Sequence, residues 1–382
     1  PAPEIRIGLV IGAGKVDIAG DSGLTILDAD STPAGEAGAG SVWTIRPQGG
    51  ALAGGAPGGW RLANQIALTF TPRTPAGLLL VNGRPYRGRV SVVRDRSGVT
   101  AINVVDLESY LLGVVPAEMG RRDPSEVEAL AAQAVISRTF AIRNLGKRAT
   151  EGFDLYGTVV DQVYGGVGAE NALTTGAVVR TAGQILTWQG TPIDAFFFST
   201  CGGRTADGTE VFAGADRPYL RSIRDLDDLG RPWCQISPRY QWREEWSAEQ
   251  LRSTLRQSLP PATGTPAEEA GTVSGVAVTA RTGSDRVASV TVQLRGGPVE
   301  VRGPAVRQVL RPAGEALLRS ALFRLSEVRG EGHLLRLVAD GNGAGHGVGF
   351  CQWGAVGRAR GGQDAFTILS AYFPGTTLSR AY

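Results

Sequence analysis

The stretch DLESYLLGVVPAEMGRRDPSEVEALAAQAVISRTFAIRN, residues 106–144, decides the fold class of this chain. Its first part repeats apolar side chains at the spacing of one helix face, namely Leu107, Tyr110, Leu111 and Val114. Further on, Asp123 has the features of an N-cap, with Pro124 at the first helical position and Glu126 completing a capping box. We therefore expect two consecutive helices, the second reaching about Asn144.

The residues on either side of this helical stretch have the composition of short strands. Strand-like runs precede it at residues 5–10, 66–70, 78–81, 89–93 and 100–105, and the glycine-rich residues 49–59 between them are predicted to form a loop. After residue 144, strand-like and helical segments are mixed without an alternating βαβ order. This pattern predicts an α+β fold, in which a β-rich N-terminal region precedes a mixed helical and strand catalytic core with a substrate groove between lobes.

Changes in pattern along the chain predict four segments. Residues 1–105 form the β-rich N-terminal region and residues 106–240 the catalytic core. Residues 241–310 form a β-containing insertion or second lobe, and residues 311–382 complete the groove with the motif GHGVG.

Composition excludes several classes of protein. Hydrophobic residues make up 42% and charged residues 20% of the chain, which is typical of a globular protein with a sizeable core. The net charge of +3 is too small to indicate a nucleic-acid partner, and no apolar run is long enough to predict a transmembrane segment. The chain begins at Pro1 and its only methionine is Met119, so we expect a removed signal peptide and an extracytoplasmic protein.

Glu118 is the first candidate for chemistry. We expect the first helix to stop at Pro116, which places Glu118 in a tight connection with apolar neighbours on both sides. A carboxylate there is expected to be partly desolvated, which raises its pKa and suits a general acid. The alternative from spacing alone is a solvated glutamate on a loop.

Several other segments combine polar side chains with glycine turns. The segments 161–166 (DQVYGG), 199–205 (STCGGRT), 218–222 (PYLRS) and 343–355 (GAGHGVGFCQWGA) each have an ordinary loop or corner as their alternative reading. In the last of them no Walker lysine follows the glycines, so a nucleotide site is disfavoured. Glycines that flank a histidine, with a tryptophan on the next helix, better suit a groove that binds sugar rings. His346 is alternatively a hydrogen-bonded structural histidine.

A cysteine nucleophile is a third option. Cys351 lies five residues from His346, and a thiol with an imidazole is a known hydrolase pair. Such pairs usually come from separate elements of the fold, so this local spacing disfavours a Cys/His wall peptidase.

Taken together, these segments resemble the SpoIID/LytB family, which contains stage II sporulation protein D and its amidase-enhancer relatives. The resemblance rests on the segments 110–119, 128–139, 161–166, 199–205, 219–222, 345–355 and 372–376, in this order along the chain. The resemblance implies a peptidoglycan lytic transglycosylase that cleaves the bond between N-acetylmuramic acid and N-acetylglucosamine, preferably in strands without stem peptides, and leaves anhydro-muramyl ends.

The resemblance also implies roles for individual residues. Glu118 falls on the family's catalytic glutamate and is expected to act first as general acid and then as base. The expected substrate-binding residues are Arg138, Asp161, Gln162, Tyr164, Ser199, Thr200, Tyr219, Arg221, His346, Gln352 and Trp353. The implied partners are glycan strands and a cell-wall amidase, and no cofactor is expected. The alternative function is a non-catalytic glycan-binding protein that activates such an amidase.

The three cysteines, Cys201, Cys234 and Cys351, contain no CxxC pair. An odd count in an exported protein suggests one disulfide and one free thiol, and we expect the bond between Cys201 and Cys234. Closing this loop would contribute about 3 kcal/mol in the chain-entropy model. Zinc at these cysteines is the alternative; because the chain has only two histidines, no metal is predicted.

Overall fold

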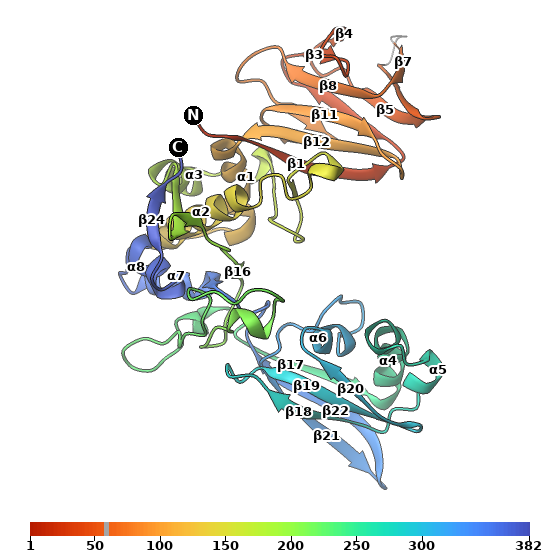
Figure 1. Cartoon of the computed structure of the whole chain (residues 1–382), viewed down its shortest axis with the longest axis vertical. Helices are drawn as coiled ribbons and strands as arrows, with labels where there is room; N and C mark the ends of the chain where they lie inside the picture. Colours follow the sequence, from red (N-terminus) through yellow and green to blue (C-terminus); the bar gives the residue numbers. More distant parts are fainter. Residues whose placement is uncertain (57–60) are drawn as a thin grey trace. The chain divides into compact units, whose positions relative to one another are not determined.

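The computed structural model in Figure 1 describes residues 1–56 and 61–382. The chain folds into two compact units. Unit 1 comprises Pro1–Asp194 with Thr377–Tyr382, and unit 2 comprises Ala195–Thr376. The described residues contain both helices and many strands in separate sheets, which confirms the predicted α+β class.

Two sheets form most of the N-terminal part of unit 1, and their strands pair antiparallel except for β13, which pairs in parallel with β1. One sheet has the strand order β13-β1-β12-β11-β8-β3-β4 and the other β10-β9-β2-β5-β6-β7. The strands are β1 (Glu4–Ala13), β2 (Val16–Gly20), β3 (Leu24–Leu27), β4 (Pro33–Ala37), β5 (Trp43–Gln48), β6 (Ala51–Gly55), β7 (Arg61–Gln65), β8 (Ala67–Pro72), β9 (Leu79–Val81), β10 (Arg84–Tyr86), β11 (Arg89–Arg94), β12 (Val99–Asp106) and β13 (Leu155–Tyr156). The five predicted strand regions are confirmed. The predicted loop at 49–59 is wrong for 51–55, which form β6, and its residues 57–59 lie outside the described part.

The sheets matter for function because β12 leads straight into the first helix. β12 is buried along almost its whole length between β1 and β11. Asp106 ends this strand and caps α1 (Leu107–Met119), where its carboxylate accepts a hydrogen bond from the Ser109 N–H at 3.0 Å. The direction of α1 is therefore set by a buried strand, and the position of every side chain on α1 follows from it.

Pro116 does not end α1, so the expected helix stop was wrong. The helix continues to Met119 and ends at Gly120, whose positive φ of 67° closes the last turn. A proline inside a helix costs one backbone hydrogen bond. Here that loss is confined to the end of a helix whose apolar residues are buried on both sides of the proline, including Val115 and Met119. Glu118 thus lies on the last helical turn rather than on a loop.

Two further helices pack against α1 in unit 1. A short 3₁₀ turn at Pro124–Glu126 precedes α2 (Val127–Arg143), and the Glu126 carboxylate accepts from the Asp123 N–H at 3.1 Å as the capping box predicted. α3 (Ala172–Arg180) follows. The small sheet β15-β14-β24, made of Thr191–Pro192, Gln184–Trp188 and Thr377–Arg380, completes the unit.

Unit 2 contains its own hydrophobic core. The sheets β17-β22-β21 and β18-β19-β20 surround it together with three helices. Their bounds are β17 (Gln241–Ser247), α4 (Ala248–Thr263), α5 (Ala267–Ala270), β18 (Gly275–Arg281), β19 (Val287–Leu294), β20 (Gly297–Arg302), α6 (Ala305–Val309), β21 (Phe323–Gly330) and β22 (His333–Asn342).

One helix expected in this region is absent. The sequence of residues 315–325 predicts a helical segment that then turns extended. Residues 315–322 instead form irregular turns, and the extended part is present as β21, which begins at Phe323. Leu318 is buried in the core, and the Arg307 guanidinium donates to the carbonyls of Leu318 and Arg319 at 2.7 and 3.0 Å. These carbonyls therefore have side-chain donors in place of helical N–H groups.

The rest of unit 2 joins short parallel strands to the C-terminal helices. β16 (Phe197–Phe198) pairs with β23 (Phe350–Cys351), which leads into α7 (Gln352–Arg360) and α8 (Ala365–Tyr372). Between β16 and β17 the regular structure consists of the 3₁₀ turns Gly208–Glu210 and Trp233–Ile236. Among the described residues, no helix combines the length and apolar character needed to cross a membrane.

Candidate active site

Glu118 is held by a backbone group from a distant loop. Its side chain is half-buried on the last turn of α1, and Oε1 accepts a hydrogen bond from the Val163 N–H at 2.7 Å. A hydrogen bond from a backbone amide fixes both the side-chain rotamer and the direction in which the carboxyl faces. The segment 161–166 therefore positions the predicted catalytic group.

A glycine in α1 allows this segment to approach. The Gly113 carbonyl accepts from the Gly165 N–H at 3.0 Å. A Cβ at position 113 would lie 2.7 Å from the Tyr164 ring and 3.0 Å from the Gly166 nitrogen. Only glycine fits at position 113. Segments 110–119 and 161–166, both part of the family resemblance, therefore pack directly against each other.

The polar residues of segment 161–166 are engaged within unit 1. Asp161 has a fully buried side chain that pairs with Arg148 at 2.7 Å and Lys147 at 3.0 Å. Gln162 is buried and its Oε1 accepts from the Tyr110 hydroxyl at 3.3 Å. Tyr164 donates its hydroxyl to Asn103 of β12 at 3.1 Å, and burial raises the pKa of both tyrosines well above the ordinary value. These contacts hold the segment in place, and the substrate-binding roles of Asp161, Gln162 and Tyr164 stay predictions.

Arg138 is fully buried and pairs with Glu108 at the opposite end of α1 from Glu118. Its Nε and terminal nitrogen donate to the two carboxylate oxygens of Glu108 at 2.9 and 2.8 Å. Burial acts to raise the pKa of Glu108, but the hydrogen bonds from Arg138 and Tyr382 outweigh it and hold the pKa below its ordinary value. A direct contact between Arg138 and a substrate would require this ion pair to open.

The predicted residues of unit 2 form a second group. Thr200 is buried, its hydroxyl lies 2.8 Å from that of Ser237 and 3.2 Å from that of Ser199, and its backbone pairs with Ala344. The Trp353 N–H, at the start of α7, donates to the Ser199 carbonyl at 3.0 Å. The STCGG corner and the GHGVG motif are therefore adjacent in space.

His346 has both ring nitrogens hydrogen-bonded to backbone. Nδ1 accepts from the Val348 N–H at 3.1 Å, so Nε2 carries the proton and donates to the Phe197 carbonyl at 2.8 Å. The rings of Phe198 and Phe212 lie 5.2 and 5.1 Å away. Burial lowers the pKa of His346 to about 4, which keeps the imidazole neutral. These contacts favour the structural reading over a proton-transfer role.

The remaining predicted residues differ in exposure. Gln352 is buried, Trp353 is half-buried, and Tyr219 is 4% exposed. Arg221 has a side chain that is 47% exposed and pairs with Asp216 at 2.6 Å and Asp207 at 3.3 Å. Arg221 is thus the member of this set best placed to meet a ligand from solvent.

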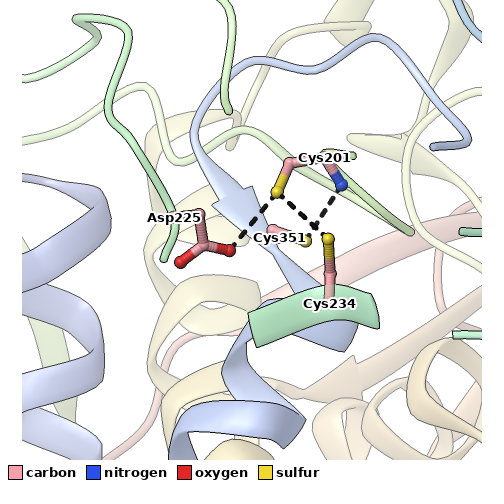
Figure 2. Close-up of side chains that lie close together, drawn as sticks. All are labelled: Cys201, Asp225, Cys234 and Cys351. Carbon is pink, nitrogen blue, oxygen red and sulfur yellow. Dashed lines mark hydrogen bonds between the residues drawn. The ribbon is translucent and has the colours of Figure 1, made fainter. Parts of the chain in front are cut away.

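All three cysteines converge on one buried point of unit 2 (Figure 2). The sulfurs of Cys201 and Cys234 lie 3.4 Å apart and are not bonded to each other in this structure. The expected disulfide between them stays a prediction. Burial raises the pKa of Cys201 and Cys351, whereas hydrogen bonds from those two thiols lower that of Cys234. Asp225 completes the cluster, and burial raises its pKa.

Two features of these sites escaped the sequence analysis. The Val163 N–H carries no residue-type signal, because any residue but proline supplies one. Asp225 lies in a segment rich in aspartate and arginine, where nothing separates a buried carboxylate from its exposed neighbours. Both follow only from long-range packing.

Two family models match parts of the chain. The family model of Stage II sporulation protein matches residues 95–188, which contain Glu118, Arg138 and segment 161–166. A second family model, a domain of unknown function called DUF8618, matches residues 233–349.

Individual relatives extend over most of the chain. A protein named Stage II sporulation protein D from Bacillus amyloliquefaciens is 32% identical over 76% of this chain and 79% of its own length. An uncharacterised protein of Brachyspira hyodysenteriae is 31% identical over 78% of this chain and 73% of its own. A Bacillus subtilis protein named Amidase enhancer is 27% identical over 70% of this chain and 40% of its own. The chain belongs to the SpoIID family.

Proposed function

We propose that this protein is an extracytoplasmic lytic transglycosylase that cleaves peptidoglycan glycan strands, with Glu118 as the single catalytic carboxyl. Membership in a family with sporulation and amidase-enhancer names supports a role at the cell wall. The observation that carries the specific proposal is the half-buried Glu118 carboxyl, fixed at 2.7 Å by the Val163 N–H. A positioned carboxyl of this kind is what general acid catalysis requires.

One carboxyl is sufficient for this reaction. A hydrolase with two carboxyls uses the second one as base or nucleophile. Here protonated Glu118 donates its proton to the glycosidic oxygen, and the bond from that oxygen to C1 of the muramic acid breaks. The resulting carboxylate takes the proton of the muramic acid C6 hydroxyl, whose oxygen bonds to C1. The products are a free glucosamine hydroxyl and an anhydro-muramyl end, and no water is consumed.

Mass spectrometry of glycan products tests the proposal. Wild type, Glu118→Gln and Glu151→Gln are incubated with intact and with peptide-free peptidoglycan. Glu151 is an exposed glutamate of the same unit, so its variant controls for the loss of one carboxylate. We expect anhydro-muramyl ends from wild type and Glu151→Gln, and a rate at least about 100-fold lower from Glu118→Gln. We expect the peptide-free substrate to react faster.

Other products would contradict the proposal. Reducing ends that contain an added water would mean a hydrolase with a second carboxyl. Equal rates for Glu118→Gln and wild type would remove Glu118 from the chemistry.

The second candidate function is a non-catalytic activator of a cell-wall amidase, favoured by the relative named Amidase enhancer. Under this function, neither substrate is cleaved although glycan strands bind. Stimulation of an added amidase would then be the same for Glu118→Gln and wild type.

A further inference from the structure

We propose that unit 2 binds one zinc ion through three thiolates and one carboxylate. The four ligands are Cys201, Asp225, Cys234 and Cys351 (Figure 2). This site is separate from Glu118 and does not depend on the proposed transglycosylase activity.

The donor atoms have the spacing of a single tetrahedral ion. All four lie within 4.8 Å of one another, with 3.4 Å between Cys201 Sγ and Cys234 Sγ and 3.3 Å between Cys201 Sγ and Asp225 Oδ2. Zinc–sulfur bonds of about 2.3 Å at tetrahedral angles place two sulfurs about 3.8 Å apart. The donors are too close together to surround a multi-iron cluster, so sulfur-rich ligation of one ion favours zinc.

Backbone amides already face the sulfurs. The Gly203 N–H lies 3.3 Å from Cys201 Sγ, and the N–H groups of Cys201 and Gly354 lie 3.1 and 3.2 Å from Cys351 Sγ. Hydrogen bonds to sulfur stabilise thiolates, the form in which cysteine binds metals. The positive φ of Gly203, 100°, is a conformation that glycine adopts without strain.

Asp225 is oriented by its own partners. Arg358 donates to Oδ1 through two nitrogens at 3.0 and 2.9 Å, and Tyr372 donates to Oδ2 at 2.8 Å. Because Arg358 occupies Oδ1, Oδ2 is the oxygen that faces the sulfurs, and one such oxygen is sufficient for a monodentate ligand. Outer hydrogen bonds of this kind are a regular feature of metal sites, and the Arg358 cation offsets part of the charge of four anionic ligands.

The space around the donors is kept open by a glycine. A Cβ on Gly354, in the first turn of α7, would overlap Asp225 Oδ2 and the Tyr372 hydroxyl, and would lie 3.1 Å from Cys351 Sγ. A helix interior normally disfavours glycine by about 1 kcal/mol relative to alanine. Its presence here preserves room beside the ligands.

A structural role for the ion follows from where the ligands come from. Three of them lie between β16 and β17, in about 40 residues whose regular structure is limited to two 3₁₀ turns. The fourth, Cys351, starts α7. Four protein ligands leave no open coordination position, so the ion would tie the irregular segment to α7 rather than activate water.

Metal analysis of the full chain is the primary test. The protein is purified without thiol reductant, dialysed against metal-free buffer and analysed for bound metal. We expect one zinc per chain, and X-ray absorption with three sulfurs at about 2.3 Å and one oxygen at about 2.0 Å. When the protein is unfolded and alkylated without reductant, we expect all three cysteines to be labelled, because none is in a disulfide.

Variants test the individual ligands. We expect Cys351→Ser and Asp225→Asn to weaken zinc binding by more than about tenfold in competition with a chromophoric chelator. Asp228→Asn changes an exposed carboxylate of the same segment and should bind zinc like wild type.

Two results on the wild-type chain would overturn the proposal without reliance on any variant. Two cysteines that resist alkylation without reductant would establish the Cys201–Cys234 disulfide. Three reactive thiols with no metal retained after addition of Zn²⁺ would leave a buried thiol cluster only.

Discussion

The buried pair of Arg138 and Glu108 makes a residue-scale prediction about stability. Removing one partner of a buried ion pair leaves the other charge uncompensated, which costs about 3–5 kcal/mol. We expect Arg138→Met to lower the free energy of unfolding by about this amount in denaturant titration. The control is Arg89→Met, because the Arg89–Glu4 pair is exposed and should cost about 1 kcal/mol or less. Equal losses would contradict the structural role of Arg138.

The same pair predicts how stability changes with pH. The pKa of Glu108 is lower in the folded than in the unfolded protein, so the unfolded state takes up its proton first as pH falls. The stabilisation is fully present above the ordinary pKa of 4.5 and is lost as pH falls through the folded value. Melting curves of Glu108→Gln should lack this part of the acid destabilisation.

His346 makes a pH prediction of the same sign in a higher pH range. Its pKa is lowered from 6.5 to about 4 by burial, so the unfolded state binds a proton more readily. Stability should therefore fall as pH drops below about 6.5 and level off below about 4. Proton NMR of His333→Gln, which leaves one histidine, should show an imidazole that stays neutral at pH 6. Protonation near pH 6.5 would contradict the buried, doubly hydrogen-bonded ring.

At the scale of elements, replacing a helical glycine by alanine should have opposite effects on stability inside and outside the contact between α1 and segment 161–166. Gly113→Ala gains helix propensity but places its Cβ against Tyr164 and Gly166, so we expect a net loss of about 1–3 kcal/mol. Gly176→Ala, in α3, meets nothing within 4 Å and should stabilise by about 0.5–1 kcal/mol. Thermal unfolding compares the two.

Gly113→Ala should also disturb the position of Glu118. Movement of segment 161–166 displaces the Val163 N–H, so Gly113→Ala should lower the rate of glycan cleavage at temperatures where the protein stays folded. An unchanged rate would mean that this hydrogen bond does not position Glu118.

Elements with local signals were predictable from the sequence. Examples are the capping box of the 3₁₀ turn before α2, the periodic face of α1 and the strands before residue 106, because their determinants lie within a few residues. The end of α1 was missed because burial of Val115 and Met119 offsets the cost of Pro116.

For the candidate site, the sequence motif identified Glu118 but not its hydrogen-bond partner, the Val163 N–H, which is 45 residues away. Pairing at that distance depends on packing, for which one sequence carries no direct signal. The four predicted segment boundaries stay predictions.

At the scale of the whole molecule, residues 377–382 are predicted to support unit 1. β24 pairs with β14 from Gln184↔Arg380 to Thr187↔Thr377, and the Tyr382 hydroxyl donates to Glu108. A chain that ends at Thr376 should lose hydrogen-exchange protection in β14. Tyr382→Phe removes only the hydrogen bond and should cost about 1.5–3 kcal/mol. Unchanged protection in the shortened chain would show that β24 is dispensable.

This pairing also has a consequence for the order of events during synthesis. Unit 1 is interrupted in sequence by the whole of unit 2, since the chain leaves it after Asp194 and returns at Thr377. Residues 1–194 emerge from the ribosome first, yet their sheet waits for a strand made some 180 residues later. At about 5–20 residues per second, that interval is on the order of ten seconds or more. During it β14 has an unpaired edge, so the nascent protein is most vulnerable to misassembly while unit 2 is being made.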